Sequence, residues 1–158
     1  MNDPGAWPGP GVSTDVGTSS QRTVRFSRAD IADFARLTGD GNLVHADADA
    51  ARRTRHRRII ASGQQTAAQM IGLASTHCSR PADGSWRDVL CLNFNFAFKA
   101  PVFADDEVSL SWTVGHVEAS GRLGGEIWHL EGRAEVSGRV CVVGRGTLLV
   151  KEIAGDGV

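Results

Sequence analysis

Two side chains that can exchange protons stand five residues apart in the segment Asp40-Gly-Asn-Leu-Val-His45. A carboxylate can accept a proton from water, and an imidazole, with an ordinary pKa of about 6.5, can accept or donate one near neutral pH. Because a glycine lies between them, the chain can turn and bring both groups to one water molecule. The segment therefore predicts acid–base catalysis by Asp40 and His45, with Asn42 orienting the loop or donating to a substrate.

A glycine at the start of a predicted helix is the third candidate. Ile60-Ala-Ser-Gly63 leads into a helical pattern over 63–77, and Ser62 is the expected N-cap. The first N–H groups of a helix have no partner inside it, and the helix dipole favours negative charge there. We therefore expect the Gly63 N–H to stabilise an oxyanion and Ser62 to lie beside the substrate.

Five arginines fall within the seven residues Arg52-Arg-Thr-Arg-His-Arg-Arg58. Guanidinium groups bind phosphate through paired hydrogen bonds, so Arg55, Arg57 and Arg58 are candidates for binding a phosphate-bearing substrate. The alternative is a solvated surface. One such cluster in a chain of net charge −1 does not predict nucleic-acid binding.

Each candidate also has a purely structural interpretation. Asp40 could serve only as a turn residue, since Asp, Gly and Asn are common in turns. His45 alone would be a structural or exposed histidine, Gly63 could be an ordinary loop glycine, and Asp47 is best explained as a helix cap. The joint occurrence of Asp40 and His45 with Phe34, Gly39, Asn42 and the segment Ile60-Ala-Ser-Gly63 favours catalysis.

The order of the predicted elements is a short strand, a helical region, one long helix and then strands. Turn and capping signals place Ser27 before a helix that ends near Leu37 and Gly39. The expected elements are a strand over 22–26, helices over 28–37, 48–53 and 63–77, and strands over 89–98, 107–117, 125–136 and 140–150. This order predicts an α+β fold, and a sheet wrapped around one long central helix is the hot-dog arrangement.

Aromatic residues recur on the strands. Phe94, Phe96 and Phe98 share one face of the predicted strand over 89–98, which favours a core or dimer interface, with a substrate pocket as the alternative. Trp112 and Trp128 are expected to pack within the sheet.

The 158 residues fit one domain, expected over 21–153, between a disordered segment at 1–20 and a flexible tail at 154–158. No apolar run approaches the roughly 18–20 residues of a membrane span, and the first 20 residues lack the pattern of a signal peptide. Three cysteines without metal-ligand spacing predict buried free thiols in a reducing cytoplasm, with a nucleophilic cysteine as the alternative.

These motifs together resemble a known family. The pattern Phe34-Ala-x-x-Thr-Gly-Asp40-x-Asn42-x-x-His45-x-Asp47, followed by Ile60-Ala-Ser-Gly63, is similar to that of the MaoC-like (R)-specific enoyl-CoA hydratases. The later Phe96-x-Phe-x-x-Pro-Val-Phe-x-x-Asp106 resembles their strand-and-turn segment, so the likeness covers about residues 22–152. This chain has Leu43 where the family usually has Pro, Asp105 where Gly is frequent, and Ser62 where His or Pro is frequent.

The resemblance implies a single hot-dog domain that forms a homodimer with active sites near the subunit interface. It implies reversible addition of water to a trans-2-enoyl thioester of coenzyme A or an acyl carrier protein, without a metal or redox cofactor. Asp40 and His45 would be the acid–base pair. The competing hypotheses are a hot-dog thioesterase and a non-catalytic acyl-thioester-binding subunit of a hydratase complex.

Overall fold

A computed structural model describes residues 15–82 and 84–153 of the chain. Its five strands form one antiparallel sheet in the order β1-β3-β4-β5-β2. The elements are β1 (Ser19–Arg25), α1 (Arg28–Thr38), the 3-10 turn η1 (Leu43–His45), α2 (Ala48–Arg53), α3 (Gly63–Ser79), β2 (Arg87–Phe98), β3 (Glu107–Ser120), β4 (Gly125–Val136) and β5 (Arg139–Glu152).

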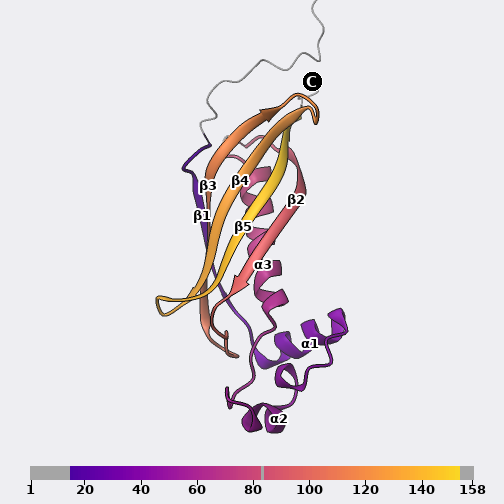
Figure 1. Cartoon of the computed structure of the whole chain (residues 1–158), viewed down its shortest axis with the longest axis vertical. Helices are drawn as coiled ribbons and strands as arrows, with labels where there is room; N and C mark the ends of the chain where they lie inside the picture. Colours follow the sequence, from indigo (N-terminus) through magenta and orange to yellow (C-terminus); the bar gives the residue numbers. More distant parts are fainter. Residues whose placement is uncertain (1–14, 83, 154–158) are drawn as a thin grey trace, which may run out of the picture.

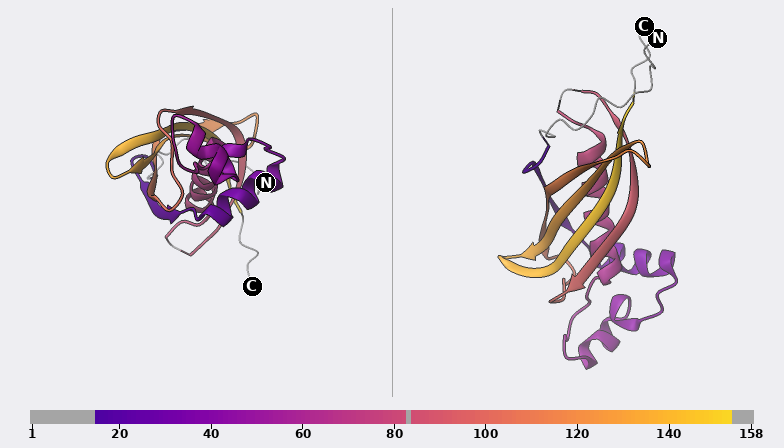
Figure 2. Two further views of the ribbon diagram at one scale, coloured as in Figure 1. Left: turned by 90° about the horizontal axis from the view of Figure 1, so that it is seen from below. Right: turned by 45° about the horizontal axis from the view of Figure 1, so that its top comes forward.

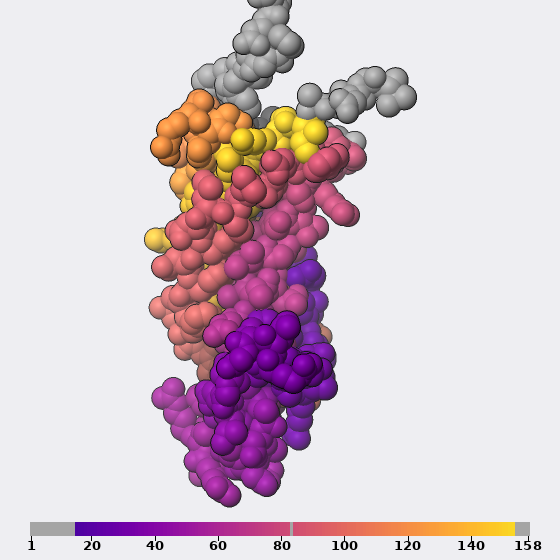
Figure 3. All heavy atoms as spheres, turned by 90° about the vertical axis from the view of Figure 1, so that its right-hand side faces the viewer, coloured from indigo at the N-terminus to yellow at the C-terminus, as the bar shows by residue number. Residues whose placement is uncertain are grey.

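The sheet curves around α3, while α1, η1 and α2 gather at the N-terminal end of that helix (Figures 1 and 2). Viewed from the side in Figure 3, a strip of α3 remains visible between β2 and β1. The predicted α+β hot-dog architecture is therefore confirmed. The helical cluster at the end of α3 carries the candidate catalytic residues Asp40 and His45. None of the described helices is both long and apolar enough to cross a membrane.

The core lies between the concave face of the sheet and α3. Every second residue of β3 from Val108 to Val114 is fully buried, which is the alternation expected of a strand with one face on the core. Met70 and Ala74 of α3 are also fully buried. The indole N–H of Trp112 donates to the Met70 carbonyl oxygen at 2.6 Å, so the largest core side chain also ties the helix to the sheet.

The predicted helix caps are confirmed. Ser27 and Asp30 form a reciprocal capping box at α1, and Gly39 ends that helix in the left-handed conformation at φ 69°. Asp47 accepts hydrogen bonds from two N–H groups of α2, and the Ser62 side chain accepts one from Gln65 at α3. These caps fix where each helix begins and therefore where the loops between them lie.

Two predicted boundaries need correction. β1 begins at Ser19 rather than at residue 22, because Ser19 and Ser20 pair with Thr113 and Trp112 of β3. The expected disorder is therefore wrong for the described residues 15–20, since Gly17 and Thr18 also exchange backbone hydrogen bonds with Val114 of β3. Residues 1–14 and the expected tail, 154–158, lie outside the described residues. The predicted loop after Asp40 contains the 3-10 turn η1. The remaining strands and α3 extend up to three residues beyond their predicted ends.

The cysteines are free thiols, as predicted, but they are not all buried. Cys78 and Cys141 are fully buried, whereas Cys91 is exposed, because it lies on the edge strand β2 beside a register irregularity. Burial raises the pKa of Cys78 to about 12 and raises the pKa of Cys141 above its ordinary value. Both buried thiols stay protonated at neutral pH, which argues against a nucleophilic role.

Candidate active site

Asp40 is held in a defined orientation at the end of α1. Its backbone N–H donates to the Ala35 carbonyl oxygen at 2.8 Å, which continues the helix cap, and its Oδ1 accepts from the Asn42 N–H at 3.1 Å. One carboxylate oxygen is thereby fixed by the loop, and the other, Oδ2, faces His45. The side chain keeps 22 % of its surface exposed, enough for access from solvent.

His45 is almost fully buried, with 6 % of its surface exposed, and its ring is fixed by the backbone. Its Nδ1 lies 2.7 Å from the Ile60 carbonyl oxygen. Because a carbonyl can only accept, Nδ1 must carry the proton, and in the neutral ring Nε2 is then an acceptor. The Ile60 N–H in turn donates to the Val44 carbonyl oxygen at 3.3 Å, so the two segments hold each other.

The two candidate groups meet, with Nε2 of His45 3.5 Å from Oδ2 of Asp40. When the imidazole is neutral and the carboxylate ionised, both facing atoms accept hydrogen bonds. A water molecule that donates one proton to each would satisfy both atoms and would direct its oxygen lone pairs away from them. This is the arrangement needed to make water a nucleophile.

Gly63 is the first residue of α3 and lies at the same site. Ser62 is buried, and its hydroxyl and carbonyl oxygens accept hydrogen bonds from the Gln65 N–H. Within the described part of the chain, nothing accepts from the N–H of Gly63. A Cβ at this position would come within 2.7 Å of the Phe98 ring, so any larger residue would displace that exposed ring from the cavity wall.

These groups line one cavity of about 450 Å³, a size that suits a small-molecule site. Its walls come from the α1–η1 loop, the segment before α3, the first turn of α3 and the chain after β2. The lining residues are Asp40, His45, Arg55, His56, Ile60, Ala61, Ser62, Gly63, Gln64, Thr66, Phe98, Lys99, Ala100, Pro101, Val102 and Val142. The cavity thus combines a histidine–carboxylate pair with a free N–H at a helix N-terminus, groups that could carry out acid–base chemistry beside an oxyanion donor.

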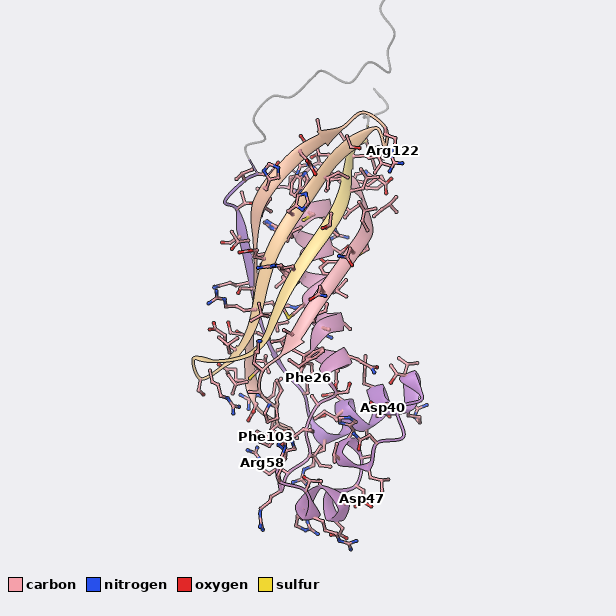
Figure 4. All side chains as sticks on the ribbon, viewed as in Figure 1. Phe26, Asp40, Asp47, Arg58, Phe103 and Arg122 are labelled. Carbon is pink, nitrogen blue, oxygen red and sulfur yellow. The ribbon has the colours of Figure 1, made fainter. Side chains whose placement is uncertain are left out.

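The candidate arginines separate into two groups. Arg55 lines the cavity, and the described residues provide it with no carboxylate. Arg58 is occupied elsewhere: its guanidinium covers the Phe103 ring at 4.4 Å and lies 3.8 Å from Asp106. In Figure 4 Arg58 and Phe103 lie on the opposite side of the helical cluster from Asp40. Arg57 is a left-handed loop residue at φ 56° and does not line the cavity.

Asn42 also lies outside the cavity lining. Its backbone N–H orients Asp40, and its side-chain oxygen caps η1 by accepting from the Val44 N–H at 3.5 Å. The structure therefore supports the loop-orienting alternative for Asn42 and brings Asp40, His45, Ser62, Gly63 and Arg55 together. Asn42, Arg57 and Arg58 do not join them.

Most lining residues were not among the site residues predicted from the sequence, and three of them bear on its chemistry: Phe98, Lys99 and Thr66. Phe98 was expected in a core or interface, with a pocket as the alternative; it is 55 % exposed, lies against Gly63 and lines the cavity, which favours the alternative. Phe94 and Phe96 pack against the core as expected. Lys99 follows Phe98 at the end of the strand, and its position before Pro101 was the available signal. Thr66 gave no sequence signal beyond lying one helical turn after Gly63.

Known protein families and sequences also match this chain. The MaoC like domain matches residues 11–131 of the chain. The (R)-specific enoyl-CoA hydratase of Aeromonas caviae is 35 % identical over 97 residues, which are 61 % of this chain and 68 % of the relative.

Solved structures match as well. The (R)-hydratase from A. caviae involved in PHA biosynthesis aligns with a TM-score of 0.75 and 28 % identity, covering 88 % of this chain and 98 % of that one. R-hydratase PhaJ1 from Pseudomonas aeruginosa aligns with a TM-score of 0.75, over 87 % of this chain and 83 % of that one; at 23 % identity it supports the fold alone. The predicted fold and the predicted class of enzyme, a hydratase or dehydratase, are thereby confirmed.

Proposed function

The chain belongs to the MaoC-like domain family, and from this premise we propose that it adds water reversibly to a trans-2-enoyl thioester to give the (R)-3-hydroxyacyl thioester. The observation that carries the proposal is the pairing of Asp40 with His45, 3.5 Å apart, in one cavity with the Gly63 N–H. The relative from A. caviae, an (R)-specific enoyl-CoA hydratase by name, supports the substrate class and the stereochemistry.

The proposed chemistry begins with a water molecule that donates to Asp40 Oδ2 and His45 Nε2. As its oxygen bonds to C3 of the substrate, the acid–base pair takes up one proton, and the π electrons of the C2–C3 bond move toward the thioester oxygen. The Gly63 N–H donates to this oxygen as negative charge develops on it. The pair then returns one proton to C2, so hydroxyl and hydrogen are added and the enzyme is unchanged. Dehydration is the reverse sequence, and neither direction needs a metal or redox cofactor.

We propose that the phosphate-bearing part of the thioester lies against Arg55 and Lys99. Both cations line the cavity, and the described residues offer neither of them a carboxylate, whereas Arg52 pairs with Asp49 and Arg58 with Asp106. Coenzyme A and the phosphopantetheine arm of a carrier protein both present phosphate to such a rim. Ser62 contributes by capping α3 and so presenting the Gly63 N–H.

We also propose that two copies of the chain form a homodimer through β2. This strand is an edge of the sheet and exposes large apolar side chains: Leu90 is 52 % and Leu92 47 % exposed. Exposed apolar edge strands pair readily with another chain. Light scattering should give twice the chain mass of 16.8 kDa, and the Leu90→Lys, Leu92→Lys double variant should be monomeric. A monomeric wild-type protein would contradict this proposal.

The proposed activity is tested with crotonyl-CoA by following the enoyl thioester absorbance and free thiol in the same reaction. Hydration removes the absorbance without releasing thiol, and the 3-hydroxybutyryl product should be the (R) enantiomer. Thiol release matching the loss of substrate would instead indicate a thioesterase. Tight binding without turnover would indicate a non-catalytic subunit.

A further inference from the structure

Thr66 places a hydroxyl group in the wall of the active-site cavity. The residue is only 1 % exposed, yet it belongs to the cavity lining together with Gly63, one helical turn before it on α3. Because Cβ atoms on a helix tilt toward its N-terminus, the side chain leans toward the end of α3 where the catalytic groups lie. Thr66 is thus a deeply buried polar residue at the site.

The hydroxyl of Thr66 differs from the other helical threonine hydroxyls of the chain. Thr38 donates to the Phe34 carbonyl oxygen at 2.9 Å, and Thr76 donates to the Gly72 carbonyl oxygen at 2.8 Å, both four residues back. No described residue supplies a hydrogen-bond partner to the Thr66 hydroxyl. Because Thr66 lines the cavity, water can solvate this hydroxyl in the empty protein, and a ligand that fills the cavity must either replace that hydrogen bond or leave the hydroxyl unpaired. The hydroxyl is therefore available to a molecule in the cavity.

Beyond Thr66 the interior is filled. Met70, one turn further along the same face of α3, is fully buried, and its carbonyl oxygen accepts from the indole of Trp112, also fully buried. Neither residue belongs to the cavity lining, whereas Thr66 and the apolar Val142 and Val102 do. The deep part of the cavity is thus short, with apolar walls and one hydroxyl.

We infer that Thr66 is a specificity-determining residue whose hydroxyl hydrogen-bonds an oxygen carried by the acyl group beyond its double bond. The inference rests on the proposed hydration of enoyl thioesters. Gly63 serves the thioester oxygen at the helix end, and Thr66 lies about 4.5 Å further along the helix axis, where we place the acyl chain. A plain alkyl chain there would leave the hydroxyl unpaired, so the site discriminates against it.

The test compares trans-2-hexenoyl-CoA with its 6-hydroxy and 5-oxo derivatives. We expect the wild-type enzyme to have the higher kcat/KM for at least one oxygenated substrate. Thr66→Val, which keeps the shape and removes the hydroxyl, should lower the ratio of kcat/KM, oxygenated over plain, at least tenfold. Thr66→Ser should retain most of the ratio. Thr76→Val changes an exposed threonine of the same helix and should leave the ratio unaltered.

An unchanged ratio in Thr66→Val, or a wild-type preference for the plain chain over both derivatives, would overturn the inference. Crotonyl-CoA separates the two proposals. Hydration of crotonyl-CoA with an unchanged ratio removes only the role of Thr66, whereas failure to hydrate any of these thioesters removes the proposed function and this inference with it.

Discussion

The described residues include two histidine–carboxylate pairs, which differ sharply in their surroundings. His129 lies on the sheet with Nε2 3.1 Å from Glu118 Oε1, closer than the 3.5 Å between His45 and Asp40. The side chains of His129 and Glu118 are 43 % and 55 % exposed, against 7 % and 22 % for His45 and Asp40. Distance alone would thus select the exposed pair rather than the one proposed to be catalytic.

The surroundings make the difference between the two pairs. The ring of His45 is fixed through Nδ1 by the Ile60 carbonyl oxygen, and Asp40 is fixed by the Asn42 N–H, so the two facing atoms are presented to one point. The exposed pair on the sheet is screened by water and stabilises the fold little. Preorganised acceptors next to a free helix N–H, rather than a short contact, mark the site.

Removing the proposed base, Asp40, should have the largest effect. In Asp40→Asn, the side-chain oxygen can still accept from the Asn42 N–H, so the turn survives while the carboxylate is lost. Hydration of crotonyl-CoA should therefore fall at least tenfold, in a protein whose circular dichroism and thermal unfolding match those of the wild type. Full activity in this variant would remove Asp40 from the mechanism.

The comparison of the two pairs is tested most sharply by matched histidine variants. His45→Gln should lower kcat at least tenfold, because the amide cannot take up a proton from water. His129→Gln, which alters the exposed pair, should keep kcat within about twofold. Equal losses in the two variants would mean that the buried pair has no special role.

A smaller effect is expected at the oxyanion donor. Gly63→Ala would put a Cβ within 2.7 Å of the Phe98 ring, which must swing into the cavity or away from it. We expect kcat/KM to fall about tenfold. In the double variant Gly63→Ala, Phe98→Ala, removing the ring should partly restore activity. A single variant as active as the wild type would show that neither the spacing nor the close approach at Gly63 matters.

The smallest effect should come from the arginines, which again form a matched pair. Arg55→Gln should raise KM for a CoA thioester several-fold, and the effect should shrink as salt is added, because the contact is with a charged phosphate at the surface. Arg58→Gln should change KM less, since Arg58 already contacts Phe103 and Asp106. A larger KM effect from Arg58→Gln would place the phosphate on the other side of the helical cluster.

Much of the fold followed from local physical chemistry. Alternation in β3 and the caps at Ser27, Asp47 and Ser62 could be identified because each depends on residues close in sequence. The start of β1 could not, because Ser19 and Ser20 are strand residues only through pairing with β3, about ninety residues away. Asp105, at a position where the related family often has Gly, adopts φ 68°, a conformation that Asp tolerates better than most residues.

The site was less completely predictable, because some of its residues come together only through contacts between distant parts of the chain. The motif of Asp40, His45 and Gly63 was visible in the chain, and the structure brings these residues into one cavity. Which arginine faces that cavity depends on the path of the loop after α2, and no periodicity encodes that path. Phe98 and Thr66 reach the site through the packing of β2 and α3, which only the tertiary structure reveals.

The central claim is that Asp40 and His45 act on one water molecule as a unit. A double-mutant cycle on kcat for crotonyl-CoA hydration tests it directly, with wild type, Asp40→Asn, His45→Gln and the double variant measured in parallel. If the two groups share one water, the double variant should lose about as much activity as the worse single variant. Losses that multiply, so that the double variant falls by the product of the two single effects, would contradict the shared water.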